Sequence, residues 1–185
     1  LSKPARHFVA GLLKHLPTII AFASPSAISY ERLAPHRWSA AYNNLGYRDR
    51  EASVRICPVA DLPGLDVAKQ FNFEFRAGDS TASPYLQLAS AVLAGIDGIR
   101  NEMEPPEPTE EDLSILDEAV IAGRGFERLP SSLEQALERL ENDQVVRSWF
   151  PDPFIDVYLK HKRGEMAHLE NMSPDEIYKA YENAY

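Results

Sequence analysis

One stretch, "QFNFEFRAGDSTASPY" (residues 70–85), constrains the fold most strongly because its first half alternates between aromatic and polar residues. Three phenylalanines fall on one side of an extended chain, while Glu74 and Arg76 fall on the other. This period of two predicts a strand with one buried face. Ser83 can then cap a helix whose apolar residues recur at helical spacing, so we expect a helix over 84–99. The sequence therefore predicts a strand that is followed directly by a helix beginning at Pro84.

A second pair of strands is predicted in "SAAYNNLGYRDREASVRICPV" (residues 39–59), which has the pattern of strand, turn and strand. Arg55 shares one face of the second strand with its polar neighbours. A loop containing Pro63 and Gly64 leads from that strand to the one at 70–76. We expect these two strands to be antiparallel neighbours, with Arg55 and Glu74 on one face.

Helices are predicted on both sides of this sheet. Residues 2–16 have a serine cap and an early proline, and residues 17–35 predict short helix or loop. The last third carries three helix-start signals, which are Ser131 with Glu134, Asp152 with Pro153, and Ser173 with Glu176. We predict an α+β fold, with an antiparallel sheet and helices at both ends.

Three parts follow from this organisation, which are helix plus sheet over 1–100, an acidic linker over 101–129 and C-terminal helices over 130–185. Residues 102–119 hold eight acids, no base and three prolines, so we expect a solvated linker. Residues 1–60 hold eight Lys or Arg and three acids, although the chain has a net charge of −9. Such a local basic region predicts an anion site, and not a nucleic-acid surface.

Cys57 is the only cysteine, which excludes an internal disulfide and favours a reducing, cytoplasmic location. We expect its thiol to act as a small buried hydrophobe. No apolar run is long enough to span a bilayer and no signal peptide is visible, so no membrane association is expected. The chain starts without methionine inside helix-like sequence, which suggests a processed or truncated product.

The arginines of the basic region are the strongest candidates for binding chemistry. Guanidinium groups match carboxylate and phosphate oxygens, and a carboxylate such as Glu74 offers the hard oxygen that Mg²⁺ prefers. Exposed charged strand faces are nevertheless common, so a solvated ion pair between Glu74 and Arg76 is the simpler interpretation of the local pattern. The candidate residues are Arg32, Arg48, Arg50, Arg55 and Arg76.

Several segments together resemble the C-terminal half of the glutamine synthetase catalytic domain. They are "SYERLAP", "GYRDREASVRI", "FEFRAGDSTASPYLQLASAVLAGIDGI", "LPSSLEQALERLENDQVV" and "FIDVYLKHKRGE". The resemblance implies ATP-dependent joining of ammonia or another amine to the side-chain carboxylate of glutamate through γ-glutamyl phosphate. It also implies a Mg²⁺ or Mn²⁺ cofactor and a homo-oligomer of stacked hexameric rings in the full-length form.

The resemblance also implies roles for individual residues. Arg32 takes the place of an arginine that binds glutamate, and Arg76 that of the arginine on the reacting carboxylate. Arg50 and Arg55 fall where the family has arginines on ATP phosphates and on the transferring group. Lys69 matches a lysine near the nucleotide, and Glu74 matches a divalent-metal ligand.

Two positions depart from the family pattern. Trp38 stands where the family has a flap glutamate that helps to deprotonate ammonium, and a tryptophan cannot accept a proton. It could line a pocket for a bulkier amine or pack as a buried residue, and we expect packing more than pocket lining. Asn72 stands where the family has another phosphate-binding arginine.

Three interpretations remain open from the sequence. The first is the C-terminal catalytic portion of such a ligase, inactive alone because the other metal ligands and the N-terminal β-domain lie upstream. The second is a non-catalytic relative that binds a ligand or serves in assembly, which the two departures favour. The third, a structural α+β domain, leaves the arginine set unexplained.

Overall fold

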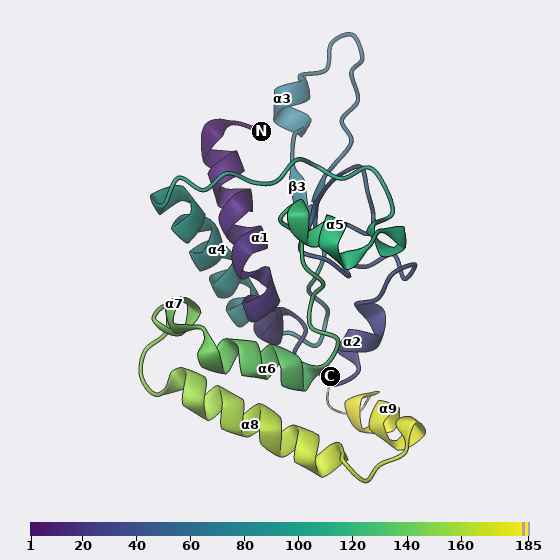
Figure 1. Ribbon diagram of the computed structural model, residues 1–185, viewed down its shortest axis with the longest axis vertical. Helices are drawn as coiled ribbons and strands as arrows, with labels where there is room; N and C mark the ends of the chain where they lie inside the picture. Colours follow the sequence, from purple (N-terminus) through teal and green to yellow (C-terminus); the bar gives the residue numbers. More distant parts are fainter. Residues whose placement is uncertain (183, 185) are drawn as a thin grey trace.

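The computed structural model describes residues 1–182 and 184. Helices surround a small sheet, which confirms the α+β class (Figure 1). Within the described residues, no helix is sufficiently long and apolar to cross a membrane. The elements are α1 (Lys3–Ala23), α2 (Ser29–Arg32), β1 (Leu45–Tyr47), β2 (Val54–Ile56), α3 (Val67–Gln70), β3 (Phe73–Phe75), α4 (Pro84–Arg100), the 3-10 helix η1 (Leu113–Ile115), α5 (Glu118–Gly123), α6 (Leu133–Asn142), α7 (Gln144–Arg147), α8 (Phe154–Leu169) and α9 (Pro174–Glu182).

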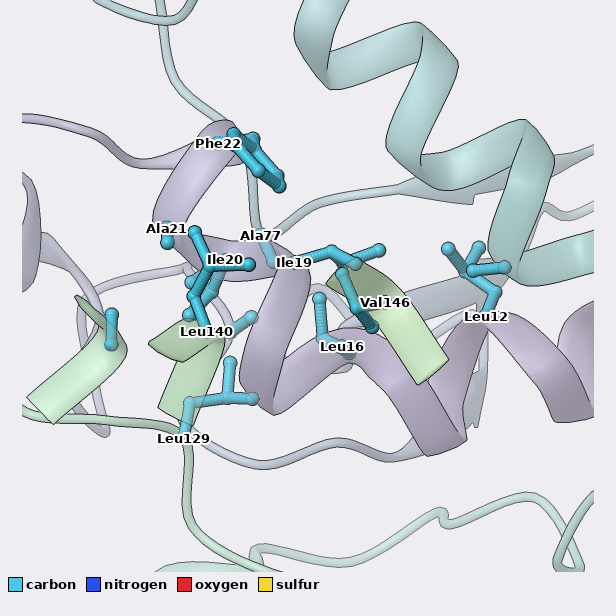
Figure 2. Packing of buried hydrophobic residues seen from close by; sticks show 14 of the residues in the cluster. Leu12, Leu16, Ile19, Ile20, Ala21, Phe22, Ala77, Leu129, Leu140 and Val146 are labelled. Carbon is cyan, nitrogen blue, oxygen red and sulfur yellow. The ribbon is translucent and has the colours of Figure 1, made fainter. Parts of the chain in front are cut away.

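Helix α1 lies at the centre of the helical part, packed against α4 along one side and α6 across its C-terminal half (Figure 1). Its apolar side chains pack against residues that come after β3 in the chain and against residues of α6 and α7. Examples are Leu140 of α6 and Val146 of α7 (Figure 2). Leu16 and Ile20 are fully buried there. Burial of such side chains stabilises a fold by about 1.5–3 kcal/mol each, which makes this cluster the main source of stability.

The length of α1 corrects one expectation, because the helix continues through Pro17 and does not end at residue 16. Proline lacks the N–H that would bond the carbonyl oxygen of Leu13. The side-chain amide of Asn43 donates to that oxygen instead, at 3.3 Å. Since a buried carbonyl needs a partner, this distant asparagine allows the helix to continue through its proline.

The contact between α1 and α4 depends on glycines, because the two backbones approach closely. A Cβ atom on Gly11 would lie 2.2 Å from the carbonyl oxygen of Ala94 and 2.6 Å from Gly98. His15 on α1 also meets Asp97 on α4 at 2.8 Å. Small residues therefore set the helix spacing, and a polar pair fixes the register.

The sheet has the order β1-β2-β3 and is mixed. Strands β2 and β3 are antiparallel as expected, and Arg55 pairs directly with Glu74. Strands β1 and β2, however, are parallel, with Gly46 opposite Arg55. The prediction of an antiparallel sheet is therefore wrong for β1 and β2. The six residues between these strands carry the chain back, so that β2 runs in the same direction as β1.

The acidic segment is more ordered than a solvated linker. Thr109 is fully buried, and its N–H donates to the carbonyl oxygen of Leu45 at 2.7 Å. Leu113, Ile121 and Phe126 form a second small core. Most of its carboxylates remain exposed, so a few anchors hold an otherwise solvated chain against β1.

Of the three predicted helix starts, the one at Ser173 is correct and the other two are shifted by one residue, since α8 begins at Phe154 with Pro153, and not Asp152, at the N-cap. Ser173 and Glu176 form the capping box of α9, with the Ser173 N–H donating to the carboxylate at 2.8 Å. At α6 the cap is Ser132, whose hydroxyl accepts from the N–H of Gln135, and not the predicted pair Ser131 and Glu134. Because Ser131 and Ser132 are adjacent, the sequence pattern alone does not show which of them caps the helix.

Candidate active site

The site is built around the carboxylate of Glu74 on β3. Arg55 Nη2 lies 2.8 Å from one carboxylate oxygen, and Arg76 Nη1 lies 3.1 Å from the other. The two arginine side chains are mostly buried, whereas that of Glu74 is 41% exposed. Strand pairing thus places two guanidinium groups on one partly open carboxylate, which is the juxtaposition predicted from the alternating pattern.

Arg76 also connects three segments of the chain. Its Nε donates to the carbonyl oxygen of Arg50 at 3.0 Å, and its Nη2 donates to that of Trp38 at 3.0 Å. Its backbone N–H donates to the carbonyl oxygen of Ser53 at 2.8 Å. Arg76 is therefore held in one orientation, as a group that must meet an anion at a fixed place should be.

Arg32, at the end of α2, donates from its guanidinium to the carbonyl oxygen of Arg76 at 3.4 Å. Its guanidinium donates to Ser39 Oγ at 2.5 Å and to the carbonyl oxygens of Ala77 and Gly78 at 3.2 and 3.1 Å. Burial lowers the pKa of Arg32 from its ordinary value, with Asp79 opposing and Arg76 adding to this shift. In this structure Arg32 clamps the backbone that follows β3, and a role in binding substrate stays a prediction.

The segment that carries Trp38 lies on the surface, which corrects the expectation that this tryptophan packs as a buried residue. Trp38 is 66% exposed, and the guanidinium of Arg50 lies 5.0 Å from its ring centre. His36 and Trp38 both have positive φ, and their N–H groups donate to the two carboxylate oxygens of Glu51. With this backbone conformation the indole lies on the surface and not in the core.

We call residues 35–38 the flap segment, because the sequence resemblance predicts that they stand where the family has its flap. Sequence reasoning missed Glu51 as the residue that holds its backbone. The expectation that the Cys57 thiol acts as a small buried hydrophobe is wrong, because Cys57 is half-buried and lies 3.7 Å from Arg55 Nη2 and 3.8 Å from Glu74 Oε2. The spacing of Cys57, two residues after Arg55 on a strand, was the available signal for a shared face.

Lys69 and Asn72 are not brought into this cluster. Lys69 is an exposed residue of α3 whose ammonium lies 3.8 Å from Asp66. Asn72 is exposed and donates to the carbonyl oxygen of Gln70. The proximity of Lys69 to a nucleotide stays a prediction, and so do the substrate and phosphate roles of the arginines.

A cavity of about 620 Å³ lies beside the flap segment, between the turn after β1 and the acidic segment. Most of its charged lining residues are acidic: Asp49, Glu51, Glu110, Glu111 and Asp112, with Arg48 and His36 opposing them. The Ser114 hydroxyl and N–H hold the pKa of Asp112 below its ordinary value, and His36 adds to the shift. This cavity therefore favours cations, in contrast to the arginine-rich site beside it.

The described residues do not form a metal site by themselves. They contain no group of three His, Cys, Asp or Glu side chains placed to share an ion. Both oxygens of Glu74 are bonded to arginines. Because Mg²⁺ and Mn²⁺ need several oxygen ligands, Glu74 could supply only one of a set completed by other residues.

The catalytic-domain model of glutamine synthetase matches residues 1–181. The chain belongs to the glutamine synthetase family. It is 34% identical over 185 residues to the gamma-glutamylpolyamine synthetase GlnA3 of Streptomyces coelicolor, covering 100% of this chain and 39% of the relative. It is 36% identical over 165 residues to the glutamine synthetase of Pyrococcus abyssi, covering 89% and 36%.

A solved structure also matches this member of the glutamine synthetase family. The crystal structure of a novel glutamine synthase homolog superposes with a TM-score of 0.83 and 39% identity, over 100% of this chain and 39% of that one. The chain thus spans less than half of the length of these relatives. Glutamine synthetases are ligases that generally use ATP and divalent metals, and the described site lies in the part that is shared.

Proposed function

We propose that the complete protein joins an amine to the γ-carboxylate of glutamate at the expense of ATP. A γ-carboxylate oxygen attacks the terminal phosphorus of ATP and releases ADP, and the amine nitrogen then displaces phosphate while losing a proton. The observation that carries this proposal is the arrangement of Arg55 and Arg76 on Glu74 in a member of this family. Two anions can meet only where positive charge offsets their repulsion.

Within this reaction, Arg76 and Arg32 bind glutamate, with Arg76 at the reacting carboxylate. Arg50 and Arg55 bind ATP phosphates, and Arg50 also stabilises the transferring group. The hydrogen bond from Arg76 to the backbone of Arg50 supports this assignment of roles, because the two arginines then lie close together at one end of the pair β2 and β3. Lys69 is proposed to approach the nucleotide from α3.

Glu74 is proposed to supply one ligand to Mg²⁺ or Mn²⁺. The remaining ligands must come from outside the described residues, since none of these forms a suitable group. We therefore propose that residues 1–185 alone do not catalyse the reaction. We also propose that the complete protein acts in the cytoplasm as a homo-oligomer, because the sequence pattern favours a reducing compartment and the family forms rings.

The amine is ammonia or an organic amine. Trp38 supports the second choice, because an exposed indole replaces the carboxylate that would accept the proton of ammonium. The named relative from Streptomyces coelicolor is a gamma-glutamylpolyamine synthetase, which gives this choice a precedent within the family. The outward position of the indole leaves room for a substrate larger than ammonia.

A second candidate is a non-catalytic relative that binds an anionic ligand or serves in assembly. Trp38 and Asn72 favour it, because each replaces a charged residue of the family pattern. Arg32, Arg50, Arg55, Glu74 and Arg76 together argue against it, since a relative under no catalytic constraint has little reason to keep all five.

The test is ADP formation by the complete protein with glutamate, ATP and Mg²⁺, across a panel of ammonium and organic amines. The proposal expects ADP release that requires both glutamate and an amine, and the 185-residue chain alone should give none. ATP binding without ADP release under any amine would support the non-catalytic alternative. ADP release by the isolated chain would overturn its proposed inactivity.

A further inference from the structure

The backbone of the flap segment adopts a conformation that non-glycine residues rarely take. His36 and Trp38 have φ angles of 62° and 55°, which lie in the left-handed region. Side chains crowd the backbone there, so such residues persist only where surrounding contacts hold them. Two left-handed residues within three positions therefore require a contact from outside the flap segment.

Glu51 provides this contact. Its Oε2 accepts a hydrogen bond from the N–H of His36 at 3.0 Å, and its Oε1 accepts one from the N–H of Trp38 at 3.4 Å. An ionised carboxylate accepts at both oxygens, and its bonds to N–H groups are stronger than those between neutral groups. One side chain thus orients two peptide groups of the flap segment.

The sheet, and not the flap segment, sets the position of Glu51. Its N–H donates to Asp49 Oδ1 at 2.8 Å in the turn after β1. The next two residues, Ala52 and Ser53, are fully buried, and the N–H of Ser53 donates to Asn44 Oδ1 at 3.3 Å. The carboxylate therefore connects a well-anchored turn to the strained backbone of the flap segment.

The flap segment in turn contacts two arginines of the proposed reaction site. The carbonyl oxygen of Trp38 accepts from Arg76 Nη2 at 3.0 Å, and Arg76 Nη1 lies 3.1 Å from the carboxylate of Glu74. The centre of the Trp38 ring lies 5.0 Å from the guanidinium carbon of Arg50. A change in the backbone at Trp38 would therefore alter the surroundings of both Arg76 and Arg50.

We propose that Glu51 is a positioning residue for the ligase reaction, and that it acts through the flap backbone on Arg76 and Arg50. The inference rests on the proposed function, and it adds to that function a residue that touches neither glutamate nor ATP. Without the carboxylate, the carbonyl oxygen and the indole of Trp38 lose their fixed places, and each guanidinium group loses a fixed partner. Displacement of a reacting group by about 1 Å can lower a rate about 100-fold, so this indirect support affects turnover.

The test measures kcat for glutamate-dependent ADP formation by the complete protein and by its variants Glu51→Ala and Glu51→Gln. Glu110→Ala is the matched control, because Glu110 lines the same cavity as Glu51 but lies in the acidic segment and does not bind the flap backbone. We expect kcat to fall about tenfold in Glu51→Ala and less in Glu51→Gln, which keeps one acceptor oxygen. Glu110→Ala should stay within about twofold of the unmodified protein, and the urea midpoint should change little in all three variants.

A second comparison separates positioning from a purely structural role. In a protein that already carries Arg76→Lys, Glu51→Ala should lower kcat by a further factor of about three or less, because the path through Arg76 is already cut. A residue that only stabilises the fold would lower kcat by the same factor in both backgrounds. Amide exchange at His36 and Trp38 should become faster in Glu51→Ala, since both N–H groups lose their acceptor.

The possible results distinguish this inference from the proposed function. Equal kcat in Glu51→Ala and Glu110→Ala, or an undiminished tenfold effect of Glu51→Ala beside Arg76→Lys, would overturn the inference and leave the ligase function standing. Faster amide exchange in the flap segment with unchanged kcat would do the same. No ADP formation by the unmodified protein with any amine would overturn the ligase function, and the inference with it.

Discussion

The helical core around α1 is held together by burial of apolar side chains, whereas the charged cluster at Glu74 on the sheet is held together by ion pairs and hydrogen bonds. In the core, α1 is buried along most of its length, and distant groups such as Asn43 and Asp97 hydrogen-bond to its buried polar atoms at Leu13 and His15. At the sheet edge, Glu74 stays 41% exposed and is held by two arginines. The core fixes where the backbone lies, whereas the edge keeps charges accessible to a ligand.

This difference separates stability from activity. Burial of apolar groups supplies most of the free energy of folding, and surface ion pairs contribute about 0–1 kcal/mol. Glu74 is 41% exposed, so water screens its pairs with Arg55 and Arg76, and we expect these pairs to contribute more to a reaction than to the stability of the fold. Substitutions in the core should change the free energy of unfolding, and substitutions at the edge should change turnover.

The largest stability effect is expected for Leu16→Ala. Leu16 is fully buried between α1 and its neighbours, so truncation leaves a cavity and should lower the free energy of unfolding by about 2–5 kcal/mol. Urea denaturation measures this change. Leu88→Ala is the control, because Leu88 is 66% exposed on α4 and its truncation should cost less than about 0.5 kcal/mol. Equal losses of unfolding free energy in both variants would contradict the assignment of stability to the buried helical core.

The next effect is expected for Arg76→Lys, which keeps the charge but removes the fork that joins Glu74, Arg50 and Trp38. We expect kcat for ADP formation by the complete protein to fall about 100-fold, or about 2.7 kcal/mol. The urea midpoint should change little. Loss of folding in parallel with turnover would show that Arg76 acts mainly as a structural clamp.

A smaller effect is expected for Gly98→Ala at the contact between α1 and α4. The new Cβ would lie 2.1 Å from the carbonyl oxygen of His7, so the helices must separate. The free energy of unfolding should therefore fall by about 1–3 kcal/mol. Gly123→Ala is the matched control, because no atom lies within 4 Å of its added Cβ and alanine favours α5. A neutral Gly98→Ala would refute the close approach of the two helices.

The smallest effect is expected for the cap of α9. The Ser173 hydroxyl and N–H lower the pKa of Glu176, so the folded value lies below the unfolded one. Stabilisation by this pair is therefore present above the ordinary carboxyl pKa and is lost as pH falls through the lowered folded pKa. Ser173→Ala should increase amide exchange at Ile177 about twofold to tenfold at pH 7, and by less at pH values where Glu176 is protonated, because the bond from the Glu176 N–H to the Ser173 hydroxyl does not need the carboxylate. An equally large difference under acid conditions would exclude the carboxylate as a contributor.

Local sequence patterns predicted the parts of this comparison that depend on neighbouring residues. The helix start at Pro84, the capping box at Ser173, and the pairing of Arg55 with Glu74 all follow from short-range spacing. The family resemblance, confirmed by the match over residues 1–181, supplied the identity of the domain.

The parts that sequence did not predict depend on distant partners. Pro17 signalled a helix end, and only the contact from Asn43 to the free carbonyl oxygen of Leu13 shows why the helix continues. The outward position of Trp38 depends on Glu51, which binds the backbone of the flap segment. The cavity needs three separate segments in space, so no local pattern could reveal it.

The most direct test of the central claim compares Glu74→Gln with Glu127→Gln in the complete protein. Glu127 meets Arg139 at 2.7 Å and has a similarly exposed side chain, but it pairs with a single exposed arginine and lies outside the Glu74 cluster. We predict that glutamate-dependent ADP formation falls about 100-fold in Glu74→Gln and stays within about twofold of the unmodified protein in Glu127→Gln. Equal activity in the two variants would contradict the assignment of the Glu74 cluster as the reaction site.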